Sequence, residues 1–127
     1  MASLHNDVFD NGLSVLDTLA DAVHITSAEA TTYANATTGG SNSLGSSSSL
    51  SIGSPTDRSA SGGGREVTVA AISDGSVSNG GTATHYALVD VSATKLLVTG
   101  ELSASQSVTS GNTFSLASST IGIPDPS

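Results

Sequence analysis

Hydrophobic and polar positions alternate most regularly from residue 82 to residue 116, in TATHYALVDVSATKLLVTGELSASQSVTSGNTFSL. Alternation with a period of two, broken by short runs of turn residues, is typical of consecutive antiparallel strands. Gly, Ser and Asn supply the breaks. We therefore expect strands over residues 82–91, 95–102 and 113–116, a short segment at 107–109, and turns at 92–94 and 110–112.

The pattern extends upstream and downstream of this stretch. Residues 66–72 read EVTVAAI and predict a strand, while Asp74-Gly75 and residues 79–81 predict turns on either side of a short segment. Residues 121–126 contain two prolines, which cannot donate to a central ladder. We expect this tail to be an extended arm or an edge strand.

The first third of the chain is less clear. Asn11-Gly12 is a strong turn signal, and it separates a predicted short strand at 8–10 from residues 13–16. We expect a strand over residues 13–16, with a helix over residues 13–22 as the alternative, because the leucines also approximate helical spacing. A strand follows at 22–26. Thr26 and Glu29 fit a capping box, which predicts one short helix over residues 28–36.

Residues 37–64 are rich in Gly and Ser, which is the composition of a flexible linker. Leu44, Leu50 and Ile52 interrupt this composition, and SLSIG at 49–53 alternates. We favour an ordered edge strand followed by a loop, with a free linker as the alternative.

Several short strands at regular spacing predict an all-β fold, an antiparallel β-sandwich or small barrel with one short helix. At 127 residues the chain is expected to form a single domain over residues 1–127, with extended arms at 1–10 and 121–127. Its core is thin, because the chain has two Phe, two Tyr and no Trp. We expect an oligomer or larger assembly to supply part of the stability.

The formal net charge is −8, and only three residues are Lys or Arg. Binding to nucleic acid or to an anionic membrane is therefore not expected, because both need several cations. An acidic stretch in the first thirty residues is read as a solvated face, with a docking patch as the alternative. Neither a secretory signal nor a membrane-spanning run is recognisable, so we expect a soluble protein that is made in the cytoplasm.

Residue chemistry predicts no enzyme, cofactor or metal site. His5, His24 and His85 stand at no zinc-ligand spacing, and no Cys is present. No GxSxG elbow occurs, and Gly62-Gly63-Gly64-Arg65 lacks the phosphate-loop pattern.

The run from GTATHYALVDV to NTFSL, with the closing IGIPDP, resembles a family of small phage and prophage proteins of alphaproteobacterial hosts. DNGLSVLDTLADAVHITSAEATTYANAT and SIGSPTDRSASGGGREVTVAAISDG resemble the same family, so the likeness covers nearly the whole chain. It implies a virion structural role, foremost a capsid cement or decoration protein on the outer surface of the head. A receptor- or glycan-binding head-fibre or tail module is the alternative.

This resemblance implies two partners, the major capsid protein and further copies of the chain. A homotrimer would suit a three-fold position on an icosahedral shell. As residues that contact the capsid or a neighbouring subunit we predict Phe9, Leu13, Val15 and Ile123.

Overall fold

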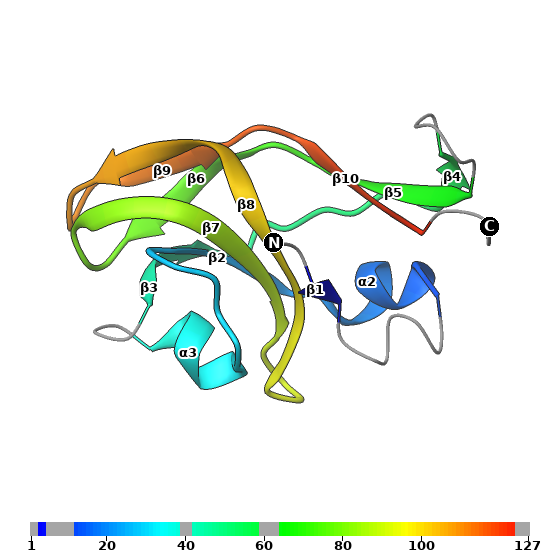
Figure 1. Ribbon diagram of the computed structural model, residues 1–127, viewed down its shortest axis with the longest axis horizontal. Coiled ribbons are helices and arrows are strands. Elements are labelled where there is room, and N and C mark those ends of the chain that lie inside the picture. Colours follow the sequence, from blue (N-terminus) through cyan, green and yellow to red (C-terminus); the bar gives the residue numbers. More distant parts are fainter. Residues whose placement is uncertain (1–2, 5–11, 39–41, 59–63, 124–127) are drawn as a thin grey trace.

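The fold is all-β and antiparallel, as predicted, in a computed structural model that describes residues 3–4, 12–38, 42–58 and 64–123. The larger sheet is curled and has the strand order β1-β8-β7-β2-β3-β6-β9 (Figure 1). Its strands are β1 (Ser3–Leu4), β2 (Ala22–Thr26), β3 (Ser43–Ser47), β6 (Ile72–Val77), β7 (Gly81–Asp90), β8 (Lys95–Val108) and β9 (Thr113–Leu116).

A smaller sheet of three strands extends away from the curled sheet (Figure 1). It has the order β10-β5-β4, in which β5 (Arg65–Val69) lies between β10 (Ser119–Ile123) and β4 (Thr56–Asp57). Helix α2 (Ser14–Leu19) lies beside this sheet, and helix α3 (Tyr33–Thr37) contacts β2 and β3 of the larger one.

Aliphatic side chains fill the main core, between the curled sheet, the small sheet and α2. Its most deeply buried members come from all three parts, and they include Leu16, Ile25, Val67, Leu88 and Leu97. A second cluster of small side chains consists of Ala22, Ala30, Ala36, Ala87 and Val89, with Tyr33 of α3 packed against it. Both faces of the sheet centre are therefore covered.

The β7–β8 hairpin is the longest element and contains two irregularities. Leu88 pairs with Val98 and Val89 pairs with Leu96, so Leu97 is an extra residue on β8. Further along, the register passes from His85↔Glu101 to Ala83↔Gln106, which sets four residues of β8 against Thr84 alone. Such bulges bend a strand and increase its twist.

The structure corrects two predictions in the first third of the chain. Residues 14–19 form α2 instead of a strand, because Leu13 and Leu16 bury one face of a single helical turn in the core. The capping box at Thr26 is wrong, since Thr26 ends β2. The helix that follows begins later, at Tyr33, and its N-cap Thr32 accepts a hydrogen bond from the amide of Asn35.

The predicted turn at Asp74-Gly75 is also wrong, because both residues lie within β6. Gly75 pairs with Phe114 on β9, and a Cβ at Gly75 would overlap the Phe114 ring. The glycine therefore makes room for an aromatic ring and does not mark a turn.

Other boundaries shift. The strand predicted over 66–72 ends at Val69, and the segments predicted at 95–102 and 107–109 are one strand, β8. The Gly/Ser-rich region contains two strands, β3 at 43–47 and β4 at 56–57, and not one at 49–53, where Ile52 forms a single bridge with Val69. The strand predicted at 8–10 lies outside the described residues.

Replacing Gly75 by Ala should destabilise the protein by about 1–3 kcal/mol, because the new methyl group must displace Phe114 from a packed core. Gly53→Ala is the matched control, since a Cβ at Gly53 has no described neighbour nearer than 3.9 Å. Urea denaturation measures both. A Gly75→Ala variant as stable as the control would contradict this packing.

Thr26→Val should stabilise the fold by about 1 kcal/mol, because the buried Thr26 hydroxyl has no hydrogen-bond partner among the described residues. Thr99→Val should have the opposite effect, since the equally buried Thr99 donates to Glu29 Oε2 at 3.1 Å. Thermal unfolding of the two variants tests the pair, and equal shifts in melting temperature would refute it.

Acidification should destabilise the protein through His24, because burial lowers the pKa of His24 below its usual value of 6.5. The unfolded chain binds the proton more readily, so stability is greatest above about pH 6.5 and falls as the pH drops through the folded pKa. His24→Gln should flatten the dependence of the unfolding free energy on pH between about 7 and 5. Parallel curves for the two proteins would show that His24 is not responsible.

Candidate functional site

Three acidic side chains, Asp21, Asp74 and Asp90, hold turns and strand ends of the chain itself. Asp74 accepts hydrogen bonds from the hydroxyls of Ser47 at 2.9 Å and Ser49 at 2.5 Å, and these bonds lower the pKa of Asp74. Asp90, which is 2% exposed, accepts from the amide of Ala93 in the β7–β8 turn. Asp21 accepts from the amide of Val91 at 2.8 Å.

His85 belongs to a short hydrogen-bonded chain. The Thr84 hydroxyl donates to the Ser27 carbonyl at 2.9 Å, so its oxygen accepts from His85 Nδ1 at 2.8 Å. This assigns the ring proton to Nδ1 and leaves Nε2 facing Glu101 Oε1 at 3.8 Å. Thr84 therefore fixes the orientation of the His85 ring.

The two described histidines lie on neighbouring strands but have different side-chain partners. His24 on β2 pairs with Ala87 and contacts the Ser43 hydroxyl through Nδ1 at 3.2 Å. His85 on β7 pairs with Thr26 and contacts Thr84 and Glu101. His5 lies outside the described residues. Within residues 12–38, 42–58 and 64–123, no group of three or more His, Asp or Glu side chains is arranged to hold a metal ion.

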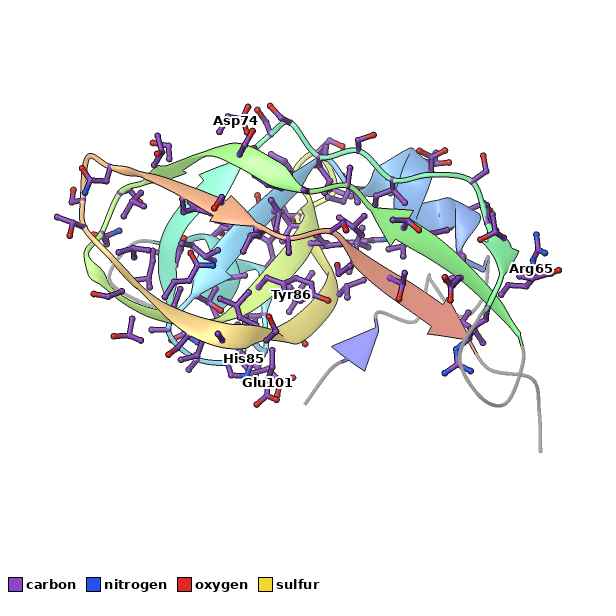
Figure 2. All side chains as sticks on the ribbon, turned by 90° about the horizontal axis from the view of Figure 1, so that it is seen from above. Arg65, Asp74, His85, Tyr86 and Glu101 are labelled. Atoms are coloured by element: carbon purple, nitrogen blue, oxygen red, sulfur yellow. The ribbon has the colours of Figure 1, made fainter. Side chains whose placement is uncertain are left out.

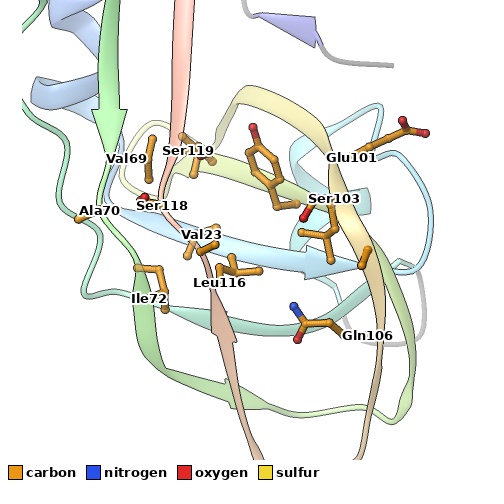
Figure 3. Close-up of a pocket in the computed structure, with 15 residues that line it drawn as sticks. Val23, Val69, Ala70, Ile72, Glu101, Ser103, Gln106, Leu116, Ser118 and Ser119 are labelled. Atoms are coloured by element: carbon orange, nitrogen blue, oxygen red, sulfur yellow. The ribbon is translucent and has the colours of Figure 1, made fainter.

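β8 and β9 do not pair with each other, and we call the gap between them the seam. The most distinctive site is a cavity of about 340 Å³ in this seam. We call this site the seam cavity. One wall is the β8 segment from Glu101 to Gln106, and the other is the link from Leu116 to Ser119 between β9 and β10 (Figure 3). Its volume lies at the lower end of the range of small-ligand sites.

The lining of the seam cavity changes from apolar to polar towards solvent. Val23, Ile72 and Leu88 of the main core form its floor. Ser103 and Ser118 lie on opposite walls (Figure 3). An apolar floor below a few polar groups is the usual composition of a binding site.

Tyr86 shapes the cavity because its ring lies over Gly100, its partner across the β7–β8 hairpin. A Cβ at Gly100 would meet the ring at 2.7 Å, so only glycine allows this position. Burial raises the pKa of the Tyr86 hydroxyl, and a hydrogen bond with Ser119 acts in the opposite direction. The ring therefore connects β7 with the start of β10 across the cavity.

One hydrogen bond spans the seam at its far end. Gln106 Nε2 on β8 donates to the Ser115 carbonyl on β9 at 3.1 Å. Between this bond and Glu101, residues Leu102 to Ser105 have no ladder partner on β7. The seam is thus closed at one end by a side chain and left open above the cavity.

Of the four residues predicted to make contacts, the three that the structure describes lie elsewhere. Leu13 is buried in the main core at 5% exposure, Val15 and Ile123 are half-buried against the same core, and Phe9 is outside the described residues. None of the described three lines the seam cavity. Their contact with a capsid or a neighbouring subunit stays a prediction.

Sequence reasoning did not find the cavity. One signal was available. Pairing the predicted strands at 82–91 and 95–102 sets the aromatic Tyr86 opposite Gly100, a glycine inside a strand. In the part of the chain that the structure describes, no helix has the length and apolar character needed to cross a membrane. Comparison with protein-family models, curated proteins and solved structures finds no match, so neither a family nor a structural relative is shown for this chain.

Proposed function

We propose that this chain is a phage virion structural protein, a capsid cement or decoration protein that binds the outer surface of the head and stabilises it. The observation that carries the proposal is the small sheet, which extends away from the curled sheet (Figure 1). Its outer strands β10 and β4 each pair on one side only among the described residues.

Open strand edges favour a role in assembly, because unpaired backbone groups pair readily with a strand of another chain. Ile121 of β10 is anchored in the main core together with Val67 of β5. The strand at the edge is therefore held in place before a partner arrives, which reduces the conformational entropy that association costs.

The uses of the acidic side chains are consistent with a structural role. Three carboxylates accept hydrogen bonds from turns and strand ends within the chain: Asp21, Asp74 and Asp90. The net charge of −8 suits contact with basic patches on a major capsid protein. A homotrimer on the shell is part of this proposal, since cyclic symmetry would repeat each weak contact.

A receptor- or glycan-binding head-fibre or tail module is the second candidate, and the seam cavity favours it. Tyr86 is the one aromatic side chain among the residues that line the cavity. Sugar sites commonly offer larger aromatic surfaces. Binding of the purified protein to host cells or to glycans would support this candidate over the first.

Particles assembled from the genome that encodes the chain test the proposal. We expect the protein in purified particles at a stoichiometric copy number, located on the outer surface by electron microscopy. Particles that lack it should lose genome at lower temperature and in low salt, and adding the purified protein back should restore their resistance. The proposal fails if the protein is missing from particles, or if particles without it are equally resistant.

A further inference from the structure

Among the described residues, a strand lies along only part of the outer edge of β8. Ser3 and Leu4 of β1 pair with Thr99 and Val98. From Gly100 to Gln106, no described strand continues along this edge. Leu102 to Ser105 also have no register partner on β7, so no described strand pairs with this segment on either side. Backbone groups that face the outer edge there can pair with an added strand.

The seam cavity lies directly beneath this edge and has room for one large apolar side chain. Its volume of about 340 Å³ is roughly twice that of a protein cavity known to take up benzene. Val23, Ile72 and Leu88 form an apolar floor, so burial of an aliphatic or aromatic group there would be favourable.

The outer face of the same edge is acidic. The Glu101 side chain is 67% exposed, and its carboxylate points away from the cavity and lies near His85 (Figures 2 and 3). Successive residues of an added strand point to opposite faces. A side chain next to one that enters the cavity would therefore lie on the same face as Glu101, where a cation is complementary to it.

We propose that the seam takes an extended segment of a partner protein that pairs with β8 from Leu102 to Ser105. The segment places an apolar side chain in the cavity and basic side chains on the outer face beside Glu101. If the proposed function is right, this partner is the capsid shell protein, and the inference rests on that function only for the identity of the partner. The Gln106–Ser115 hydrogen bond limits the segment to about five residues.

The pentapeptide acetyl-TKFKT-amide is the probe, because its Phe and Lys side chains face opposite sides of a strand. Titrated into the ¹⁵N-labelled full-length chain, it should shift the amide resonances of Leu102, Ala104, Ala117 and Ser118. Acetyl-TEFET-amide should bind at least about three-fold more weakly, and acetyl-TKSKT-amide at least about ten-fold. Equal affinities for the three peptides, or no shifts at millimolar peptide, would overturn the proposal.

Two variants locate the charge contact. Glu101→Gln should weaken binding of acetyl-TKFKT-amide about two- to five-fold. Glu66→Gln, which makes the same change on β5 outside the cavity lining, should leave the affinity unchanged. A loss of affinity that is the same in both variants would show a general effect of net charge and would contradict a site at the seam.

Competition separates this inference from the proposed function. If the protein decorates shells and the peptide displaces it, both are supported. If decoration is unaffected by peptide at saturation and by Glu101→Gln, the protein binds shells by another surface and the inference about the partner is wrong. If the peptide binds the seam while particles contain no copies of the protein, the site stands and the proposed function fails.

Discussion

Two contacts between an aromatic ring and a glycine on the neighbouring strand determine how the curled sheet packs. Tyr86 lies opposite Gly100 on the β7–β8 hairpin, and Phe114 lies opposite Gly75 between β9 and β6. In each case a Cβ on the glycine would collide with the ring. These pairs use two of only four aromatic side chains in the chain, so aliphatic residues must fill the remaining interior. The sheet has to curl tightly for such short side chains to meet.

The sequence predicted the parts of the fold in which local pattern and tertiary environment agree. The predicted strand over 113–116 matches β9, and the predicted strand over 82–91 differs from β7 by one residue at each end. Both were predictable because alternation of polar and apolar residues indicates a strand with one buried face. Gly75 was misread as a turn because a glycine in a strand looks locally like a break, and its purpose depends on Phe114, about forty residues away. Six residues of α2 are too few for periodicity to separate a helix from a strand.

The capping box failed for a similar reason. Thr26 and Glu29 have the right spacing, but each makes contacts with residues far away in the sequence instead of capping a helix. Thr26 completes β2, and Glu29 accepts a hydrogen bond from Thr99, seventy residues further along the chain. The pairing of Tyr86 with Gly100 was the one local signal, and it could not predict the seam cavity alone, because the cavity also requires the four-residue irregularity of β8 and the placement of β9 at the opposite edge of the sheet. Neither is encoded in a local pattern.

The open seam follows from the connection between the two sheets. β8 and β9 are consecutive in the chain, and pairing between them would close the curled sheet into a barrel with no free edges. β9 is only four residues long, and the chain then leaves through Ala117 and Ser118 to build β10 in the other sheet. The bulge of β8 opposite Thr84 bends that strand at the same level. Closing the seam would therefore require β9 to continue at the expense of β10, one of the two outer strands of the small sheet. An exposed edge next to an apolar cavity can pair with other chains, which is a risk of aggregation. In the proposed complex, the charge of Glu101 and the Gln106 hydrogen bond would restrict which segments enter. Selective occupation by the proposed partner would then make this opening contribute to assembly instead of aggregation.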